Sequence, residues 1–180
     1  IKHNARHRYQ SVTQVYNKLS ELNDTYKESL TLTSQQSLKI SFVGAQRRIG
    51  TTHTALLFTS YMNRYIAPCI YSEENKKPVV NDIVERYGES NHRDGMLSLY
   101  DCKLECRTGF VNQEKKYLVT VIDYGELTKD NLDMFLEADI KVVILGAKDW
   151  EVKASECALE RLIGFDEIIY LFNFVDGTSY

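Results

Sequence analysis

The sequence predicts an α/β domain in which a mainly parallel sheet is flanked by helices, with an N-terminal helical appendage. Two observations predict this class. Short apolar strands alternate with segments of ten or more residues that carry helical spacing, which is the pattern of repeated β-α-β units. These strands are apolar almost throughout, as expected when helices cover both faces of a sheet. The length of 180 residues suits one such domain plus an appendage.

The first part of the chain, residues 1–36, is predicted to be an amphipathic helix and a linker. Apolar residues recur at spacings of three and four from Tyr9 to Leu22, and the run from Thr31 to Ser37 is polar. The opening residues include Lys2, His3, Arg6, His7 and Arg8 and no acid. Such a start suits either a solvated helix end or a contact with anionic lipid at the cytoplasmic side of a membrane.

The second part, residues 37–180, is predicted to be the α/β domain. Its strands are expected at 39–44, 67–72, 96–100, 105–111, 117–122, 140–145 and 167–172, the third and fourth as a hairpin. Its helices are expected at 51–64, 78–87, 127–138 and 150–163, with Pro78 at the first helical position. The chain stops soon after its last strand, so the domain could be truncated at its C-terminus.

Composition limits the classes of function. The net charge of −3 gives no clear nucleic-acid signal. The four cysteines are interpreted as reduced thiols of a cytoplasmic protein. No apolar run approaches the roughly 20 residues that a membrane-spanning helix needs. We therefore expect a cytoplasmic protein, with the basic N-terminal region as a potential contact to the inner face of the membrane.

The most informative segment is Gly44-Ala-Gln-Arg-Arg-Ile-Gly-Thr-Thr52. It follows a predicted strand and opens a predicted helix, which is the context of a phosphate-binding loop. Glycines let the backbone approach a phosphate, and the amides at the helix start face the anion. A standard loop places lysine directly after its last glycine, and here Thr51 has that position. Thr52 stands where a Mg²⁺-binding hydroxyl is expected.

This segment resembles the deviant Walker A loop of the ParA/MinD family of P-loop NTPases (the SIMIBI type), which reads Lys-Gly-Gly-x-Gly-Lys-Thr-Thr. Aligned on Gly50, the lysine that reaches across the family's dimer falls on Gln46. The two glycines fall on Arg47 and Arg48, and the phosphate lysine falls on Thr51. The resemblance covers about residues 38–177. With both lysines absent, the chain resembles the TadZ/CpaE type, whose loop is atypical, more than a working partition ATPase.

Three further positions carry the resemblance. Asp123, in Val-Ile-Asp-Tyr-Gly125, is similar to the family's Asp-x-x-Gly switch in a shortened form. Glu73 and Glu74 lie where the family's first catalytic aspartate sits, and Asn173 resembles the asparagine that reads adenine. The resemblance implies phosphate or base contacts by Gly44, Gln46, Arg47, Arg48, Gly50, Thr51, Thr52 and Asn173. It implies Mg²⁺ ligation by Thr52 and Asp123, and it supplies no catalytic residue.

The function that this resemblance implies is that of a bacterial pseudo-ATPase: a regulatory, scaffolding or positioning module that binds ATP or ADP with Mg²⁺ weakly or not at all. It would act through protein partners and could form a homodimer. Two alternatives remain open. In one, Arg47 or Arg48 replaces the lysine of an active Mg²⁺-dependent ATPase. In the other, the chain is a structural interaction module that binds no nucleotide.

Several of these residues also have a purely structural interpretation. Gly44 and Gly50 could serve only a tight turn, and Asp123 could cap the following helix. Asn173 could bond nearby backbone. Trp150 is expected either to pack on the core or to anchor a partner, and Asp149 is well placed to cap the helix that Trp150 opens.

Overall fold

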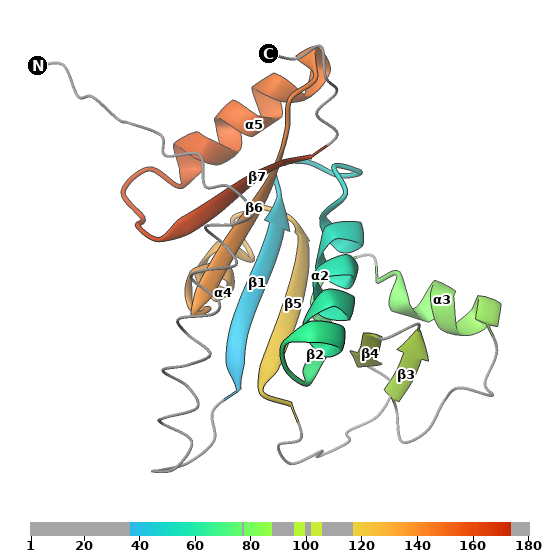
Figure 1. Cartoon of the computed structure of the whole chain (residues 1–180). Helices are drawn as coiled ribbons and strands as arrows, with labels where there is room; N and C mark the ends of the chain where they lie inside the picture. Colours follow the sequence, from blue (N-terminus) through green and yellow to red (C-terminus); the bar gives the residue numbers. More distant parts are fainter. Residues whose placement is uncertain (1–36, 77, 88–95, 100–101, 106–116, 174–180) are drawn as a thin grey trace, which may run out of the picture. The chain divides into compact units, whose positions relative to one another are not determined.

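A seven-stranded sheet with the strand order β3-β4-β2-β5-β1-β6-β7 forms the centre of the computed structural model (Figure 1). The structure describes residues 37–76, 78–87, 96–99, 102–105 and 117–173. The strands are β1 (Leu38–Gly44), β2 (Cys69–Glu73), β3 (Met96–Leu99), β4 (Cys102–Glu105), β5 (Val119–Glu126), β6 (Ile140–Gly146) and β7 (Ile168–Asn173). The helices are α2 (Thr51–Tyr65), α3 (Val80–Tyr87), α4 (Leu132–Leu136) and α5 (Asp149–Arg161).

The sheet is mainly parallel, as the sequence predicts. Each neighbouring pair from β4 to β7 in the sheet order is parallel, and β3 alone runs antiparallel, beside β4 at the edge. β1 lies between β5 and β6, with Phe42 opposite Asp123 and Gly44 opposite Ile144. The carboxyl ends of β1, β5 and β6 therefore meet at one edge, where parallel sheets bind ligands.

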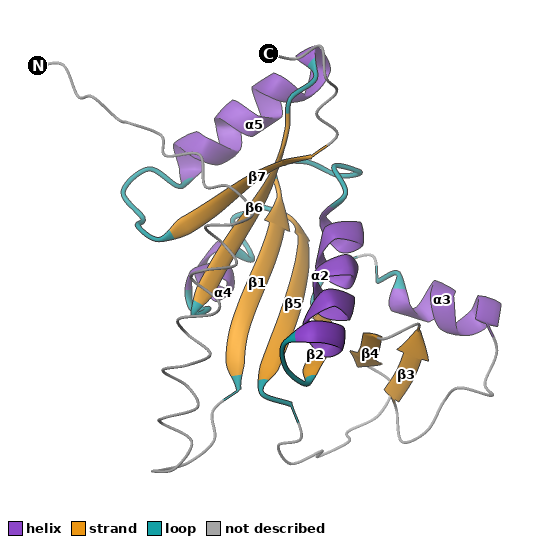
Figure 2. Ribbon diagram, in the orientation of Figure 1, coloured by secondary structure: helices purple, strands orange, loops and turns teal. Residues whose placement is uncertain are grey.

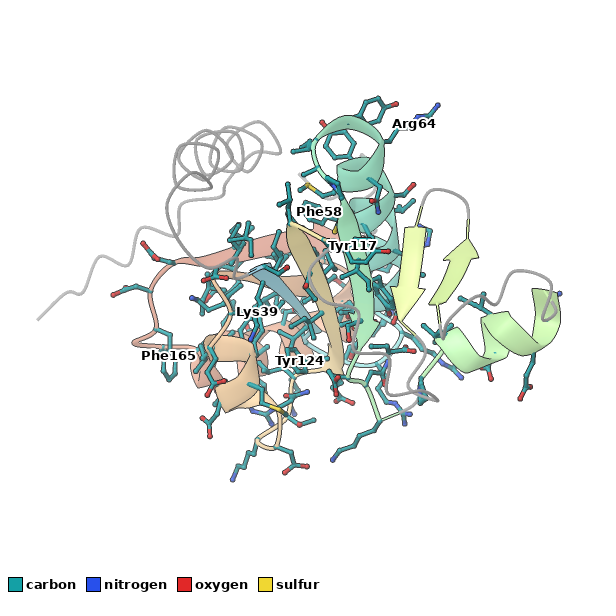
Figure 3. All side chains as sticks on the ribbon, turned by 90° about the horizontal axis from the view of Figure 1, so that it is seen from below. Lys39, Phe58, Arg64, Tyr117, Tyr124 and Phe165 are labelled. Atoms are coloured by element: carbon teal, nitrogen blue, oxygen red, sulfur yellow. The ribbon has the colours of Figure 1, made fainter. Side chains whose placement is uncertain are left out.

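Helices cover both faces of the sheet, and two adjacent residues of β1 show how. The ring of Phe42 packs at a tilt against that of Phe58 of α2, with ring centroids 5.5 Å apart. Val43 belongs instead to a cluster with Tyr124 of β5 and Phe135 of α4. Since successive strand residues point to opposite faces, α2 covers one face and α4 the other (Figure 2). Figure 3 shows Phe58 and Tyr124 on opposite sides of the sheet.

Several predicted boundaries were wrong. The helix expected from Pro78 begins at Val80. The strand expected to begin at residue 105 begins instead at Cys102, in β4, and the rest of that expected strand, residues 106–111, lies outside the described residues. β5 runs past Asp123 to Glu126, and the helix expected over 127–138 is confined to α4. This last difference arises because Asn131 turns the chain: its side-chain oxygen accepts the N–H of Thr128, and its amide donates to the carbonyls of Tyr124 and Glu126.

The start of α5 also differs from expectation. Trp150 does not pack on the core, because 74% of it is exposed. Lys148, and not Asp149, is the cap residue, and its backbone N–H donates to the Glu151 carboxylate at 3.3 Å. Ser155 fixes the helix against the end of β6 by bonding both the N–H and the carbonyl of Gly146.

The predicted N-terminal helix and linker, residues 1–36, lie outside the described residues. Among the residues that are described, no helix is both long enough and apolar enough to cross a membrane.

Candidate functional site

The loop between β1 and α2, residues 45–50, is shaped by two residues with positive φ. Arg48 has φ 62° and Gly50 has φ 95°, with the buried Ile49 between them. Because a left-handed conformation beside a right-handed one turns successive amides toward one side, this is the backbone pattern of an anion-binding nest. Gly44 is needed for close packing: a Cβ there would overlap the Thr51 hydroxyl and lie 2.6 Å from Cγ2 of Ile49.

The loop also leaves amide donors available at the start of α2. The N–H of Thr54 bonds the carbonyl of Gly50 at 2.9 Å and begins the helical pattern. Within the described part of the chain, no backbone acceptor bonds the N–H groups of residues 46–53. α2 has 15 residues, so its dipole adds positive potential at the same place. The loop can therefore take an anion through its backbone.

The two positions after Gly50 have different environments. The Thr51 side chain, at the predicted lysine position, is buried against Gly44. The Thr52 hydroxyl instead donates to Oδ2 of Asp123 at 2.6 Å, which joins the loop to β5. The predicted metal pair is thus in direct contact.

Asp123 is fully buried and is held by three hydrogen-bond donors. Oδ2 accepts from Thr52 and from the hydroxyl of Tyr71 at 2.9 Å, and Oδ1 accepts from the N–H of Gly125 at 2.8 Å. The side chain therefore does not cap α4, which begins at residue 132. Gly125 has φ 69°, and a Cβ there would approach the side chain of Asn75 to 3.0 Å, so glycine is required after the aspartate.

Tyr71 is a site residue that the sequence interpretation missed. Burial, together with the nearby charges of Asp123 and Glu73, raises the pKa of Tyr71 far above its usual value, so the hydroxyl is a proton donor. The alternation of β2 could have revealed it, because Cys69, Tyr71 and Glu73 are the buried positions of that strand. Tyr71 is thus on the same side of the strand as the acid that sequence reasoning selected.

Glu73 lies beside Asp123 on the neighbouring strand, and it is 2% exposed. Its carboxylate accepts the N–H of Val79 at 2.8 Å and that of Val80 at 2.9 Å, which caps α3. Burial raises the pKa of Glu73, and the two backbone donors only partly oppose this effect. Glu74, the other candidate at this position, is exposed.

Asn173, at the end of β7, contacts the loop between β1 and α2. Its side-chain amide donates to the carbonyl of Ile49 at 2.9 Å, which links the end of β7 to the loop. The structure thus brings together Gly44, Gly50, Thr51, Thr52, Asp123 and Asn173. Gln46 is half-buried in the loop, and Arg47 and Arg48 are exposed on it; none of the described carboxylates forms an ion pair with either arginine.

Comparison with solved structures identifies the architecture. The chain superimposes on a ParA family ATPase from Chlorobium tepidum with a TM-score of 0.58 at 11% identity, over 80% of this chain and 77% of that one. A putative plasmid partition protein from Borrelia burgdorferi, bound to AMPPNP, gives a TM-score of 0.56 at 12% identity over the same shares. The kinase domain of the Escherichia coli tyrosine kinase ETK gives 0.55 at 10% identity, over 98% of this chain and 86% of that one.

The chain has the α/β fold of P-loop NTPases, in its ParA/MinD-like form. No protein-family model matches the sequence, and no curated protein matches it significantly. At identities this low the likeness concerns the fold. In that fold the β1–α2 loop occupies the phosphate-loop position, after the first strand and at the start of the first helix of the described domain.

The residues present fit a phosphate and a magnesium ion in part. The loop amides suit phosphate oxygens, and Thr52 and Asp123 offer an oxygen pair of the kind that Mg²⁺ shares with phosphates and water. Among the described residues, no group of three or more His, Cys, Asp or Glu side chains could hold a metal by itself. A metal here would therefore depend on the phosphates for most of its ligands.

Proposed function

We propose that the chain is a ParA/MinD-like nucleotide-binding domain with an atypical, lysine-less Walker A loop, which binds ATP or ADP and hydrolyses ATP weakly or not at all. The observation that carries this proposal is the 2.6 Å hydrogen bond between Thr52 and Asp123 at the base of the loop. It joins the two residues that P-loop proteins use beside a nucleotide-bound Mg²⁺. Thr52 and Asp123 are the residues that would hold a metal here, and the metal would neutralise phosphate charge.

Weak hydrolysis follows from the charges that the loop lacks. Phosphoryl transfer needs cations aimed at the charge that develops on the transferred group. Thr51 is buried at the lysine position and carries no charge. Gln46 is neutral at the position of the second lysine. The carboxylate of Glu73 is bound to the start of α3, so it is not available to activate water. The same reasoning argues against efficient kinase activity.

The proposal includes action through protein partners, as a regulatory, scaffolding or positioning module of the TadZ/CpaE type. Exposed apolar side chains around α5 support it: Trp150 is 74% exposed and Ile163 is 78% exposed. A homodimer and a contact of the basic residues 1–8 with the inner face of a bacterial membrane belong to the same proposal. Binding of the full chain to anionic, but not neutral, vesicles would support the membrane contact.

Thermal unfolding of the full chain with ATP, ADP or GTP tests the nucleotide site. A ligand that binds only the folded state stabilises it by about 2.7 kcal/mol at a hundred times Kd, so adenine nucleotides are expected to raise Tm. Arg48→Ala is expected to reduce the shift, because guanidinium groups at the loop would contact phosphate. Arg64→Ala, at the far end of α2, is the matched control and is expected to leave the shift unchanged.

Phosphate release by the same samples separates the alternatives. The proposal predicts nucleotide-dependent stabilisation with little or no release of phosphate. Mg²⁺-dependent release that is lost in Arg47→Ala or Arg48→Ala would identify an arginine-assisted ATPase instead. The absence of any shift at millimolar nucleotide would contradict nucleotide binding and leave a structural interaction module.

A further inference from the structure

The Tyr71 hydroxyl and the Thr52 hydroxyl donate to the same oxygen, Oδ2 of Asp123. Thr52 belongs to α2, at the end of the loop. Tyr71 belongs to β2, the strand that pairs with β5, and it is fully buried. Neither the fold nor phosphate binding requires a hydroxyl at position 71, because a phenylalanine ring would fill the same space. The hydroxyl therefore has a local role at the carboxylate.

This role concerns how the charge of Asp123 is stabilised. A buried carboxylate is costly unless it is paired, and the usual solution beside a nucleotide is a metal ion. A carboxylate offers about four acceptor positions, and here Thr52, Tyr71 and Gly125 use three of them. Mg²⁺ demands near-octahedral geometry and gives up its water reluctantly, so a direct Mg²⁺ contact at Oδ2 would have to displace a hydroxyl that is already bound.

We propose that Tyr71 withholds Asp123 from Mg²⁺, so that the β1–α2 loop binds nucleotide without needing the metal. The first half of this inference is that Asp123 does not bind Mg²⁺. The second half is that nucleotide binds without the metal, and this half rests on the function proposed above. Tyr71 is then a positioning residue: it touches neither nucleotide nor metal, and it acts by holding the carboxylate against Thr52. Its hydroxyl thereby determines whether nucleotide binding at this loop needs Mg²⁺.

Tyr71→Phe tests the first half, with Mg²⁺ alone as the probe. The variant keeps the buried ring and removes the hydroxyl. Thermal unfolding of the full chain is compared in EDTA and in millimolar Mg²⁺. The wild type is expected to unfold at the same Tm in both, whereas Tyr71→Phe is expected to have a lower Tm in EDTA and to recover part of it in Mg²⁺. Tyr124→Phe is the matched control, because it removes a buried hydroxyl on the other face of the sheet.

The second half is tested by calorimetric titration of the wild type with ADP and ATP in the same two buffers. Kd is expected to change by less than about tenfold, which corresponds to less than ~1.4 kcal/mol. Binding that occurs only with Mg²⁺ would overturn the inference while leaving the proposed function intact. If neither buffer supports binding, the proposed function fails, and the Mg²⁺ response of Tyr71→Phe alone decides whether Tyr71 withholds Asp123. If Mg²⁺ raises the Tm of Tyr71→Phe no more than it raises that of the wild type, the inference is overturned in every case. A strong rise in the Tm of the wild type with Mg²⁺ overturns it as well, even if the variant does not fold.

Discussion

Asn173, the last residue of β7, donates a hydrogen bond from its side-chain amide to the carbonyl of Ile49 in the β1–α2 loop, 2.9 Å away. Asn173→Ala removes this bond and is expected to lower the free energy of unfolding by about 1 kcal/mol. Titration with ATP and GTP then separates two roles. An equal loss of affinity for both nucleotides means that Asn173 supports the loop, and a loss confined to ATP means that it reads the base.

Gly44→Ala is expected to abolish nucleotide binding. The new Cβ would overlap the Thr51 hydroxyl and crowd Ile49, and such overpacking costs ~1–3 kcal/mol. Gly164→Ala is the control for destabilisation alone: Gly164 has φ 92° in open space, so a side chain there is strained by about 1–2 kcal/mol. Denaturant titration should show both variants destabilised, and preserved nucleotide binding in Gly44→Ala would contradict the assignment of the loop.

Thr51→Lys restores an ammonium at the position where the loop lacks one. We expect ATP affinity to rise about tenfold, because a hydrogen bond to a charged group contributes ~1.5–3 kcal/mol and each 1.4 kcal/mol is tenfold. His53→Lys places the same charge on the exposed side of the first helical turn and controls for a general electrostatic gain. Equal gains in the two variants, measured calorimetrically, would argue against a phosphate at this loop.

Glu73→Gln is expected to change the pH dependence of stability. Burial raises the pKa of the Glu73 carboxyl above its usual range, so the folded state binds this proton more tightly than the unfolded state. The protonated carboxyl therefore adds stability at pH values below the unfolded pKa, and this contribution is lost as pH rises through the folded pKa. The glutamine oxygen can still accept the bonds from Val79 and Val80. The Tm of the variant minus the Tm of the wild type should therefore increase from acidic to neutral pH.

Glu85→Gln gives the matched comparison, since Glu85 is an exposed acid of the same helix α3 and is not among the charges that raise the pKa of Glu73. Its substitution should leave the shape of the Tm–pH profile close to that of the wild type. A Glu73→Gln profile that runs parallel to the wild-type profile would refute the effect of burial.

The sequence predicted the fold because the strands and the strand-to-helix loop have strong local patterns. β1, β6 and α2 lie within one or two residues of their predicted bounds. The contact between Thr52 and Asp123 also agrees with the resemblance, which assigns both residues to one Mg²⁺ site. The predicted base and phosphate contacts remain predictions.

The contacts that sequence reasoning missed depend on tertiary packing. The hydroxyl of Tyr71 reaches Asp123 only because β2 and β5 are neighbours in the sheet, and strand order is not encoded locally. Pro78 was expected to begin α3, whereas the helix begins at Val80, and the Glu73 carboxylate at the end of β2 accepts the N–H groups of Val79 and Val80. Trp150 was expected either to pack on the core or to anchor a partner. In the structure α5 turns Glu151, Ser155 and Ala158 inward and leaves Trp150 exposed.

The two contacts that shape the loop join residues separated by 71 and 124 positions in the chain. Contacts of such long range form late in folding, because the entropy of closing a long loop opposes them until the intervening elements are in place. Among the described strands, β7 is the last to emerge during synthesis. A growing chain therefore cannot form the bond between Ile49 and Asn173 until the other six described strands have been made, and the loop reaches its final form only then.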